Sequence, residues 1–503
     1  MHNCMQKAII IGSGVAGLAS AIRLAVQGFE VTVFEKNSYP GGKLSGITKG
    51  NYHFDAGPSL FTQPQNIEDL FALAGEDMAA YLPYERVSLA CRYFYENGKV
   101  LDAYADAAKF AAELHNVMGE DADKVLQYLH QAGQLYHNIG SIFLNNSLHK
   151  ASTWLRPSIA KALASINPKY LFKTLHAINA GSFTNPQTVQ LFDRFATYNG
   201  STPYQAPGML SLIPHLEHNE GTFYPKGGMI SITNALYQLA QKKGVHFNFN
   251  TPVDRIIESQ GKVLGVVANN KNIYADVVVS NMDVLFTYKH LLDNNNITEK
   301  LKKQPRSSSA MVFYWGIKKE FEQLHLHNIF FSDNYKAEFD CLFKAGSMYP
   351  DPTVYLNITS KCEPGLHAPP GCENWFILVN APAYSGQNMQ HLRTQCRANT
   401  ISKLNRMLNT DVEALIEEEE ILDPLQIESK TASYAGALYG TSSNTKMAAF
   451  LRHPNFTNQI QRLYFVGGSV HPGGGIPLCL KSAKITADII AKDKIKWGNS
   501  HHQ

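Results

Sequence analysis

Residues Ala8-Ile9-Ile10-Ile11-Gly12-Ser13-Gly14-Val15-Ala16-Gly17 join an apolar run directly to a glycine-rich turn. An apolar helical pattern follows, and a second apolar run, Val31-Thr32-Val33-Phe34, then ends on Glu35. The order strand, glycine turn, helix, strand and acid predicts a βαβ unit that binds a dinucleotide. A tight turn without a ligand is the alternative interpretation of this segment.

Each conspicuous residue of this pattern has a physical role. Gly12 permits the tight turn, Gly14 lets the backbone approach a pyrophosphate, and Gly17 lets helix and strand pack closely. The N–H groups at the start of the helix would face the phosphates. Glu35 follows the turn by about twenty residues, where its carboxylate can accept hydrogen bonds from ribose hydroxyls.

Two further segments extend this predicted site. Pro40-Gly41-Gly42-Lys43 and Phe54-Asp55-Ala56-Gly57-Pro58-Ser59 come soon after the acidic strand end. A second close approach of the backbone suits a longer, buried dinucleotide, and Lys43 can neutralise a phosphate. Taken alone, Gly41-Gly42 fits an ordinary loop better.

The C-terminal part carries another glycine-rich turn between a strand and a helix. The apolar run 463–466 leads into residues 467–477, and a helical pattern follows over 478–492. Pro477 suits a first helical turn, where its missing N–H costs nothing. The glycines let the backbone lie flat against a planar ring, and a helix N-terminus favours negative charge there. These features favour a flavin. The sequence shows no second nucleotide-binding turn, so a nicotinamide co-substrate is disfavoured.

Over nearly its whole length, the chain resembles the phytoene desaturase family of bacterial carotenoid desaturases, which use FAD. The most family-specific anchors are Tyr224-Pro225-Lys226-Gly227-Gly228-Met229 and residues 467–484. The resemblance implies an α/β fold in which a Rossmann-type FAD-binding domain, like those of glutathione reductase and the amine oxidases, is interleaved with an α+β substrate domain. It implies FAD contacts at Gly12, Gly14, Ala16, Gly17, Glu35, Lys36, Gly42, Lys43, Gly57, Pro58, Ser59, Val253 (at the adenine), Gly467, Gly468, Gly475, Ile476 and Pro477.

The two domains are expected to alternate along the chain. The FAD-binding domain is expected to comprise residues 1–80, 224–285 and 430–503, and the substrate domain residues 81–223 and 286–429. The charge run Glu417–Glu420 is interpreted as a solvated face or a helix end. Hydrophobic periodicity predicts helices over 105–114, 121–135 and 230–242, and strands over 245–250, 262–268, 273–280 and 310–315.

Composition limits the class of protein. A chain of 503 residues exceeds one typical domain, and a net charge of +3 is too small to predict nucleic-acid binding. The seven cysteines show neither a C-x-x-C pair nor a zinc-ligand spacing, so no metal site is predicted and a reducing cytoplasm is expected. The sequence also predicts neither a signal peptide nor a membrane-spanning segment.

A carotenoid dissolves in membranes rather than in water, so the protein is expected to touch a membrane surface without crossing it. The expected location is the cytoplasm, at the inner face of the plasma membrane. Segment 151–178 is the best candidate, because basic residues beside apolar ones suit an anionic lipid surface. A solvated helical hairpin is the alternative. The residues concerned are Lys150, Arg156, Lys161, Lys169 and Lys173, with Trp154, Leu155, Tyr170, Leu171 and Phe172.

The implied reaction is desaturation, in which one carbon beside a polyene loses a hydride to the flavin and its neighbour loses a proton. The sequence does not identify the proton acceptor. His215, Glu217 and His218 precede the Tyr224 motif and are candidates, although a hydrogen-bonding role at the surface or in the core is the favoured interpretation for each. The resemblance implies a quinone or oxygen as the electron acceptor.

Two segments bear on which carotenoid is the substrate. Residues Leu60-Phe61-Thr62-Gln63-Pro64 lack the aromatic-rich character usual in phytoene desaturases at this place, and they contain no Trp. Residues 198–207 and 214–218 resemble the hydroxycarotenoid 3,4-desaturase branch, whose substrates carry a tertiary hydroxyl near one end. An Asn-Gly turn followed by a proline-rich loop is the alternative interpretation. The side chains with suitable chemistry to recognise the hydroxyl are Asn199, Thr202 and Tyr204.

The sequence therefore favours 3,4-desaturation of a 1-hydroxycarotenoid. Desaturation of phytoene to lycopene or an intermediate is a close second interpretation. Carotenoid isomerisation, which leaves the mass unchanged, comes third. Non-catalytic binding of a prenyl lipid comes last, because the intact glycine turns and Glu35 argue against a chain that has lost its flavin.

Overall fold

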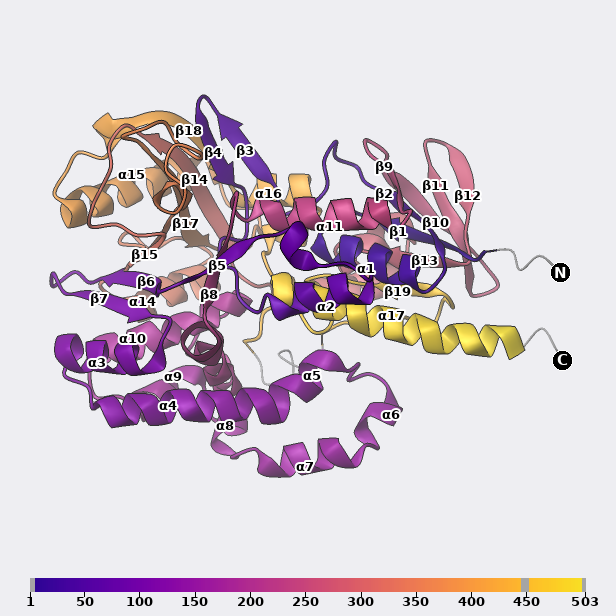
Figure 1. Ribbon diagram of the computed structural model, residues 1–503, viewed down its shortest axis with the longest axis horizontal. Coiled ribbons are helices and arrows are strands. Elements are labelled where there is room, and N and C mark those ends of the chain that lie inside the picture. The colour runs from indigo at the N-terminus through magenta and orange to yellow at the C-terminus, as the bar shows by residue number, and fades with distance from the viewer. Residues whose placement is uncertain (1–4, 445–451, 500–503) are drawn as a thin grey trace.

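The computed structural model describes residues 5–444 and 452–499 (Figure 1). At its centre lies a parallel sheet whose strands come from three distant parts of the chain. Because all its strands run in one direction, their carboxyl ends share one edge. The strand order is β19 (Leu463–Phe465), β13 (Val277–Ser280), β1 (Lys7–Ile11), β2 (Glu30–Phe34) and β9 (His246–Asn248).

Both faces of the central sheet are covered, which explains why β1 is apolar throughout. Successive side chains of a strand point to opposite faces. Ile10 packs with helices α1 (Val15–Val26), α11 (Ile230–Lys242) and α17 (Ile476–Asn499), which Figure 1 shows together on one side. Ile9 and Ile11 pack on the other side against a three-stranded antiparallel sheet. Its strands are β10 (Val253–Ser259), β11 (Lys262–Ala268) and β12 (Lys271–Tyr274).

The predicted strand over 273–280 proves to be two strands in different sheets. β12 ends at Tyr274, and β13 begins at Val277. Between them, the Asp276 N–H donates to the Lys7 carbonyl, and the Asp276 carboxylate accepts from the Lys7 N–H, both at 2.9 Å. This pair anchors the chain where it crosses to the central sheet, and a continuous apolar pattern does not reveal such a crossing. The predicted helix 230–242 and strand 262–268 coincide with α11 and β11.

A second, seven-stranded sheet lies beside the central one and is drawn from both halves of the predicted substrate domain. Its middle strand, β14 (Ser309–Ile317), is buried at every residue. Trp315 lies directly opposite Trp375 of the neighbouring strand β17. The order is β18 (Ile416–Leu422), β14, β17 (Glu373–Ala381), β16 (Val354–Ile358), β15 (His327–Phe330), β6 (Leu89–Phe94) and β7 (Val100–Tyr104).

The charge run Glu417–Glu420 does not end a helix, which was one of its two interpretations, but Glu417 is exposed and the other three glutamates are half-buried, as a solvated face requires. These residues form edge strand β18, which pairs with β14. The Trp315 indole donates to Glu419 at 2.7 Å, and the Tyr52 hydroxyl donates to Glu417 at 2.7 Å. The charges therefore satisfy buried donors of the sheet, and charged side chains at a sheet edge also oppose pairing with other chains.

Helices cover the other end of the seven-stranded sheet. α3 (Ala107–Met118) and α4 (Ala122–Leu135) lie at the predicted helical segments 105–114 and 121–135. The Asp106 and Asp121 side chains accept N–H groups of their first turns, which fixes where each helix begins. Their apolar faces pack with α9 (Leu175–Ala180) and α10 (Pro186–Asp193) in an aromatic cluster containing Phe110, Tyr128, Phe183 and Phe192.

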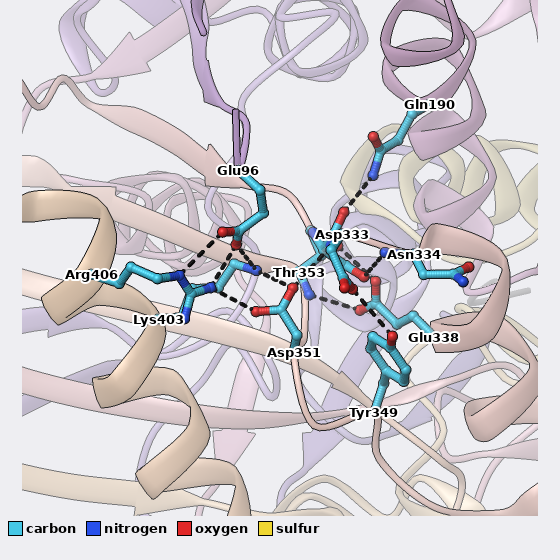
Figure 2. Close-up of polar contacts among 11 residues, drawn as sticks. Glu96, Gln190, Asp333, Asn334, Glu338, Tyr349, Asp351, Thr353, Lys403 and Arg406 are labelled. Atoms are coloured by element: carbon cyan, nitrogen blue, oxygen red, sulfur yellow. Dashed lines mark hydrogen bonds and ion pairs between the residues drawn. The ribbon is translucent and has the colours of Figure 1, made fainter. Parts of the chain in front are cut away.

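A polar cluster fastens helix α15 (Met389–Leu408) to the loops beside β6 and β16 (Figure 2). Lys403 is buried and pairs with Glu96 at 3.0 Å and Asp351 at 2.9 Å. Glu338 accepts from both the N–H and the hydroxyl of Thr353, and burial raises the pKa of its carboxyl to about 7. Within the cluster, Lys403 is paired with two carboxylates from separate loops, and these pairs hold the elements together.

The other elements connect these layers. The further strands are β3 (Gly46–Lys49), β4 (Tyr52–Asp55), β5 (Tyr84–Val87) and β8 (Thr222–Pro225). The further helices are α2 (Gln65–Leu73), α5 (Ser141–Asn145), α6 (Ala151–Trp154), α7 (Pro157–Ser165), α8 (Lys169–Phe172), α12 (Val284–Phe286), α13 (Asn295–Lys302), α14 (Tyr335–Asp340) and α16 (Pro424–Thr431).

Candidate functional site

The first glycine turn leaves no room for side chains. Gly12 has a φ of +91°, which favours glycine. A Cβ atom on Gly17 would lie 2.1 Å from the Gly12 carbonyl oxygen, and a Cβ on Gly14 would lie 2.8 Å from the Asn281 amide. Ala16 is buried in the first turn of α1. The backbone of this turn is therefore the surface that a ligand would meet.

Asn281 links the two ends of the chain, and the sequence analysis did not single it out as a site residue. It follows β13, between β1 and β19. With its amide oxygen facing the first turn, it accepts from the N–H groups of Gly14 at 3.2 Å and Gly17 at 3.3 Å. A Cβ on Gly467 would lie 2.8 Å from the same amide. A polar residue just after a buried strand that neighbours β1 was the available signal.

Glu35 lies at the end of β2 beside the first turn. Its carboxylate accepts from the Ser13 N–H and hydroxyl, each at 2.8 Å, and from the Asn37 N–H at 2.9 Å. The Thr251 N–H donates to the Glu35 carbonyl at 2.8 Å, which brings the segment before Val253 alongside. Lys36 points elsewhere, because its ammonium donates to the Ser429 carbonyl at 2.5 Å.

The second glycine pair packs on the first turn. The Gly41 N–H donates to the Ser13 carbonyl at 2.9 Å, and a Cβ on Gly42 would lie 3.4 Å from the Gly14 Cα. The two backbone segments therefore lie side by side, and together they are called the backbone cradle below.

Lys43 and the segment after β4 extend this cradle. The Lys43 ammonium donates to the Leu438 carbonyl at 2.8 Å, and burial lowers the pKa of this group. A Cβ on Gly57 would lie 2.0 Å from the Lys43 carbonyl, so only glycine fits there. After Pro58, Ser59 reaches the seven-stranded sheet through a 2.8 Å hydrogen bond between its hydroxyl and that of Tyr355.

The C-terminal turn runs from Gly467 to Pro477 and leads into α17. The Gly467 N–H donates to the Ser482 hydroxyl at 3.2 Å. Arg452 is buried and donates to the carbonyls of Gly468 at 3.1 Å and Tyr439 at 2.5 Å. Burial lowers the pKa of its guanidinium to about 10, so it stays a cation at neutral pH.

A largely apolar cavity opens against this turn. Gly475 and Pro477 form part of its wall. Facing them are apolar residues of the helical region, with few polar groups between them. The apolar lining includes Phe143, Leu144, Leu148, Met209, Leu210, Leu212, Ile213, Leu216 and Leu478, and the polar side chains are Thr62, Gln63, Tyr136, Tyr198, Asn199, Ser443, Arg452 and His471.

Only one of the three residues predicted to recognise a hydroxyl lines this cavity. Asn199 contributes to its wall. Thr202 is buried elsewhere, with its N–H donated to the Asn444 side chain at 2.9 Å. Tyr204 packs beside His176, with ring centroids 4.7 Å apart, and under the Lys336 ammonium. Neighbours in sequence thus diverge because residues 194–199 form a short helix that ends at Gly200.

The three proton-acceptor candidates lie outside the cavity wall. Glu217 pairs with Arg194 at 3.1 Å, and both are buried. His218 stacks on Phe110, with ring centroids 4.0 Å apart, and burial lowers the pKa of its imidazole. His215 accepts from the Asn219 amide at 2.8 Å and lies behind Tyr136. Each of the three side chains thus makes a hydrogen bond, an ion pair or a ring contact within the protein.

Within the described ranges, no group of three or more His, Cys, Asp or Glu side chains could hold a metal ion. In the same ranges, no helix has both the length and the apolar character needed to cross a bilayer.

A model of the family described as "flavin containing amine oxidoreductase" matches residues 15–491. A 1-hydroxycarotenoid 3,4-desaturase from Flavobacterium sp. (strain P99-3) is 52% identical over 97% of this chain and 99% of that protein. A 4,4'-diapolycopene oxygenase from Methylomonas sp is 33% identical over 98% of this chain and 99% of its own length.

Solved structures share the fold at low sequence identity. An oxidoreductase from Methanosarcina mazei has a TM-score of 0.63 at 15% identity, covering 97% of this chain and all of that one. Putrescine oxidase bound to putrescine has a TM-score of 0.62 at 12% identity, covering 97% of this chain and 99% of that one. The expected Rossmann-type, amine-oxidase-like fold is therefore confirmed.

Replacing Gly14 with Val should abolish retention of a dinucleotide while the fold persists. The new side chain would fill the space beside Asn281, and affinity should fall by roughly tenfold or more, which corresponds to about 1.4 kcal/mol. Visible absorbance of the purified protein reports the bound flavin, and circular dichroism reports the fold. Gly46→Val is the matched control, because a Cβ there meets only ordinary contacts. Full colour in Gly14→Val would contradict the assignment.

Glu217→Gln should lower the free energy of unfolding by about 3 kcal/mol, because it leaves the buried Arg194 guanidinium without its counter-charge. Chemical denaturation measures this change. The double variant Arg194→Met/Glu217→Gln should recover much of the loss. Unchanged stability with lost turnover would instead indicate that Glu217 acts in the chemistry.

Proposed function

This chain belongs to the flavin-containing amine oxidoreductases, and we propose that it is an FAD-dependent desaturase that introduces the 3,4 double bond into a 1-hydroxycarotenoid. The observation that carries the proposal is the 52% identity, over nearly the full length of both chains, to a protein with that activity. The apolar cavity beside the C-terminal glycine turn supports it, because a hydrocarbon chain needs such a wall next to the cofactor.

The described residues fit FAD. The first glycine turn and the Gly41-Gly42 backbone form a cradle that side chains would fill, which suits a pyrophosphate. Glu35 beside this cradle suits the ribose hydroxyls, and the backbone at Val253 suits the adenine. We assign the FAD-binding part to residues 1–80, 224–285 and 430–503. This proposal includes the cofactor contacts expected from the sequence, although the Lys36 ammonium is engaged by the Ser429 carbonyl.

When bound, FAD supplies the two-electron oxidant for the reaction. The proposed reaction removes one hydrogen from C3 and one from C4 of the substrate, and a double bond forms between these carbons. The two electrons and two protons that leave the substrate would reach a quinone or oxygen as the final acceptor, with FAD as the immediate oxidant.

The protein contributes position and environment to this step. The apolar wall holds one bond of the chain against the C-terminal turn and excludes water from it. The N-terminal end of α17 and the Arg452 cation place positive charge at the same turn, which favours electron transfer onto the group bound there.

Purified protein in liposomes should convert a 1-hydroxylated carotene to a product lighter by two hydrogens, with a longer-wavelength absorbance from the extended polyene. Phytoene offered under the same conditions should react more slowly. Mass spectrometry and absorbance spectra measure both outcomes. Preferential conversion of phytoene would favour a phytoene desaturase, and an unchanged mass an isomerase. A product that contains an added oxygen atom would indicate an oxygenase, like the more distant relatives. Binding of the carotene without any conversion would indicate a prenyl-lipid carrier.

We further propose that helices α6 to α8, which lie at the lower edge in Figure 1, contact the membrane surface. Three large apolar side chains are exposed there: Trp154 at 45%, Leu155 at 83% and Phe172 at 68%. Lys161 and Lys173 are exposed on the same segment. Not every predicted residue faces outward, since Tyr170 is buried and Lys150 lies over the Phe456 ring. Apolar side chains flanked by cations suit an anionic lipid surface.

Leu155→Ser/Phe172→Ser should bind vesicles of anionic phospholipid roughly tenfold more weakly in a flotation assay, because each apolar side chain contributes about 1.5–3 kcal/mol when fully buried. Leu366→Ser/Tyr274→Ser is the matched control, since these residues are also exposed but lie elsewhere. Neutralising Lys161 and Lys173 should weaken binding to anionic vesicles only. Equal vesicle binding by the first variant and its control would show that helices α6 to α8 do not contact the membrane surface.

A further inference from the structure

The short distance between the hydroxyl and the reacting carbons of the proposed substrate limits which residues can bind the hydroxyl. In a 1-hydroxycarotenoid, the oxygen is joined to C3 through only three bonds of about 1.5 Å each. When the C3–C4 bond lies against the C-terminal turn, the hydroxyl must therefore lie in the same cavity, within a few ångströms of that turn. The groups that recognise it must be polar side chains of this cavity wall.

We propose that Gln63 and Tyr136 together form the binding site for the substrate hydroxyl, an inference that rests on the proposed function. Both line the cavity that Gly475 and Pro477 also line, and the Gln63 amide is hydrogen-bonded to the Tyr136 hydroxyl. They come from separate elements, the loop before α2 and the end of α4.

The pair has the hydrogen-bonding capacity that an alcohol needs. If the Gln63 amide nitrogen donates to Tyr136, then the tyrosine O–H and the amide oxygen stay available; if the amide is turned, then its N–H₂ and the tyrosine oxygen stay available. Within the described part of the chain, neither the Gln63 amide nor the Tyr136 hydroxyl makes another hydrogen bond. In both orientations the pair offers one donor and one acceptor, and a tertiary hydroxyl can use both.

The surroundings hold both side chains in place. Gln63 is 3% exposed and has a left-handed φ of +55°, which non-glycine residues adopt only where the structure compels it. Its carbonyl accepts from the Asn66 N–H at 3.1 Å and the Asn66 side chain at 3.2 Å, so the loop is tied to α2.

The Tyr136 ring is fixed in the same way. It packs on His215, with ring centroids 5.1 Å apart. Burial and the nearby Glu220 raise the pKa of the Tyr136 hydroxyl, so it keeps its proton and can donate.

Two other polar groups of the cavity wall are already engaged by backbone carbonyls. Arg452 donates to the carbonyls of Tyr439 and Gly468, and His471 donates to the Asn146 carbonyl at 2.9 Å. Asn199 also lines the wall and is the competing candidate that the sequence suggested. Gln63 lies in the segment 60–64, which lacks the aromatic-rich character usual in phytoene desaturases. The absence of large aromatic side chains there leaves space for a polar group that recognises the hydroxyl.

The test compares Gln63→Leu and Tyr136→Phe with a matched pair outside the cavity. Tyr170 donates to Gln131 at 3.1 Å on the same helical region, which makes Gln131→Leu and Tyr170→Phe the controls. For each FAD-loaded variant in liposomes, kcat/KM is measured for a 1-hydroxylated carotene and for the same carotene without the hydroxyl. Equilibrium binding of the two carotenes is measured separately by quenching of tryptophan fluorescence.

Wild-type protein and both controls should prefer the hydroxylated carotene. Each cavity variant should lose about tenfold or more of that preference, because a site built for a hydroxyl rejects analogues strongly. A wild-type enzyme without the preference overturns the proposed substrate. Three results would overturn the assignment to Gln63 and Tyr136. The preference for the hydroxylated carotene could persist in Tyr136→Phe, it could fall equally in the controls, or it could be lost only in Asn199→Leu. Tyr136→Phe alone decides if Gln63→Leu does not fold.

Discussion

The meeting of three strand ends at one edge of the central sheet is the constraint on which the rest of the structure depends. β1, β13 and β19 run parallel, so their carboxyl ends and the turns that follow them lie together. Asn281 stands between the first and last turns, in contact with Gly14, Gly17 and Gly467. A single amide thereby lies between two backbone segments more than 450 residues apart, and both segments belong to the proposed cofactor site.

The substrate side is arranged differently, because it must present hydrocarbon rather than backbone. Helices and the loops between them supply apolar side chains to the cavity, and two groups of buried charges are paired outside its wall. Arg194 with Glu217, and Lys403 with Glu96 and Asp351, illustrate this pairing. Since an unpaired buried charge is costly, these pairs let charged residues hold the region together without facing the hydrocarbon. The Ser59–Tyr355 hydrogen bond connects this region to the cofactor side.

Predictions from local sequence patterns were correct where a segment has a long and regular hydrophobic periodicity. Helix α11 and strand β11 are such cases. They failed where a distant partner decides the outcome. The glutamates of β18 were considered a possible helix end, but they pair with β14 and accept hydrogen bonds from Trp315 and Tyr52, which are far away in sequence. Asn199 and Tyr204 are near neighbours in sequence, yet only Asn199 reaches the cavity.

The sequence by itself determined the glycine turns, the acid after β2, the strand-to-helix order at both ends of the chain and the class of cofactor. These features depend mainly on local backbone conformation. Glycine is the residue that readily adopts a positive φ, so glycine-rich turns can be recognised from the order of residues. The tertiary structure alone decided that Asn281 joins the turns and that Gln63 meets Tyr136 beside the last one. These contacts join residues far apart in sequence, and their geometry follows from packing, which no local pattern records.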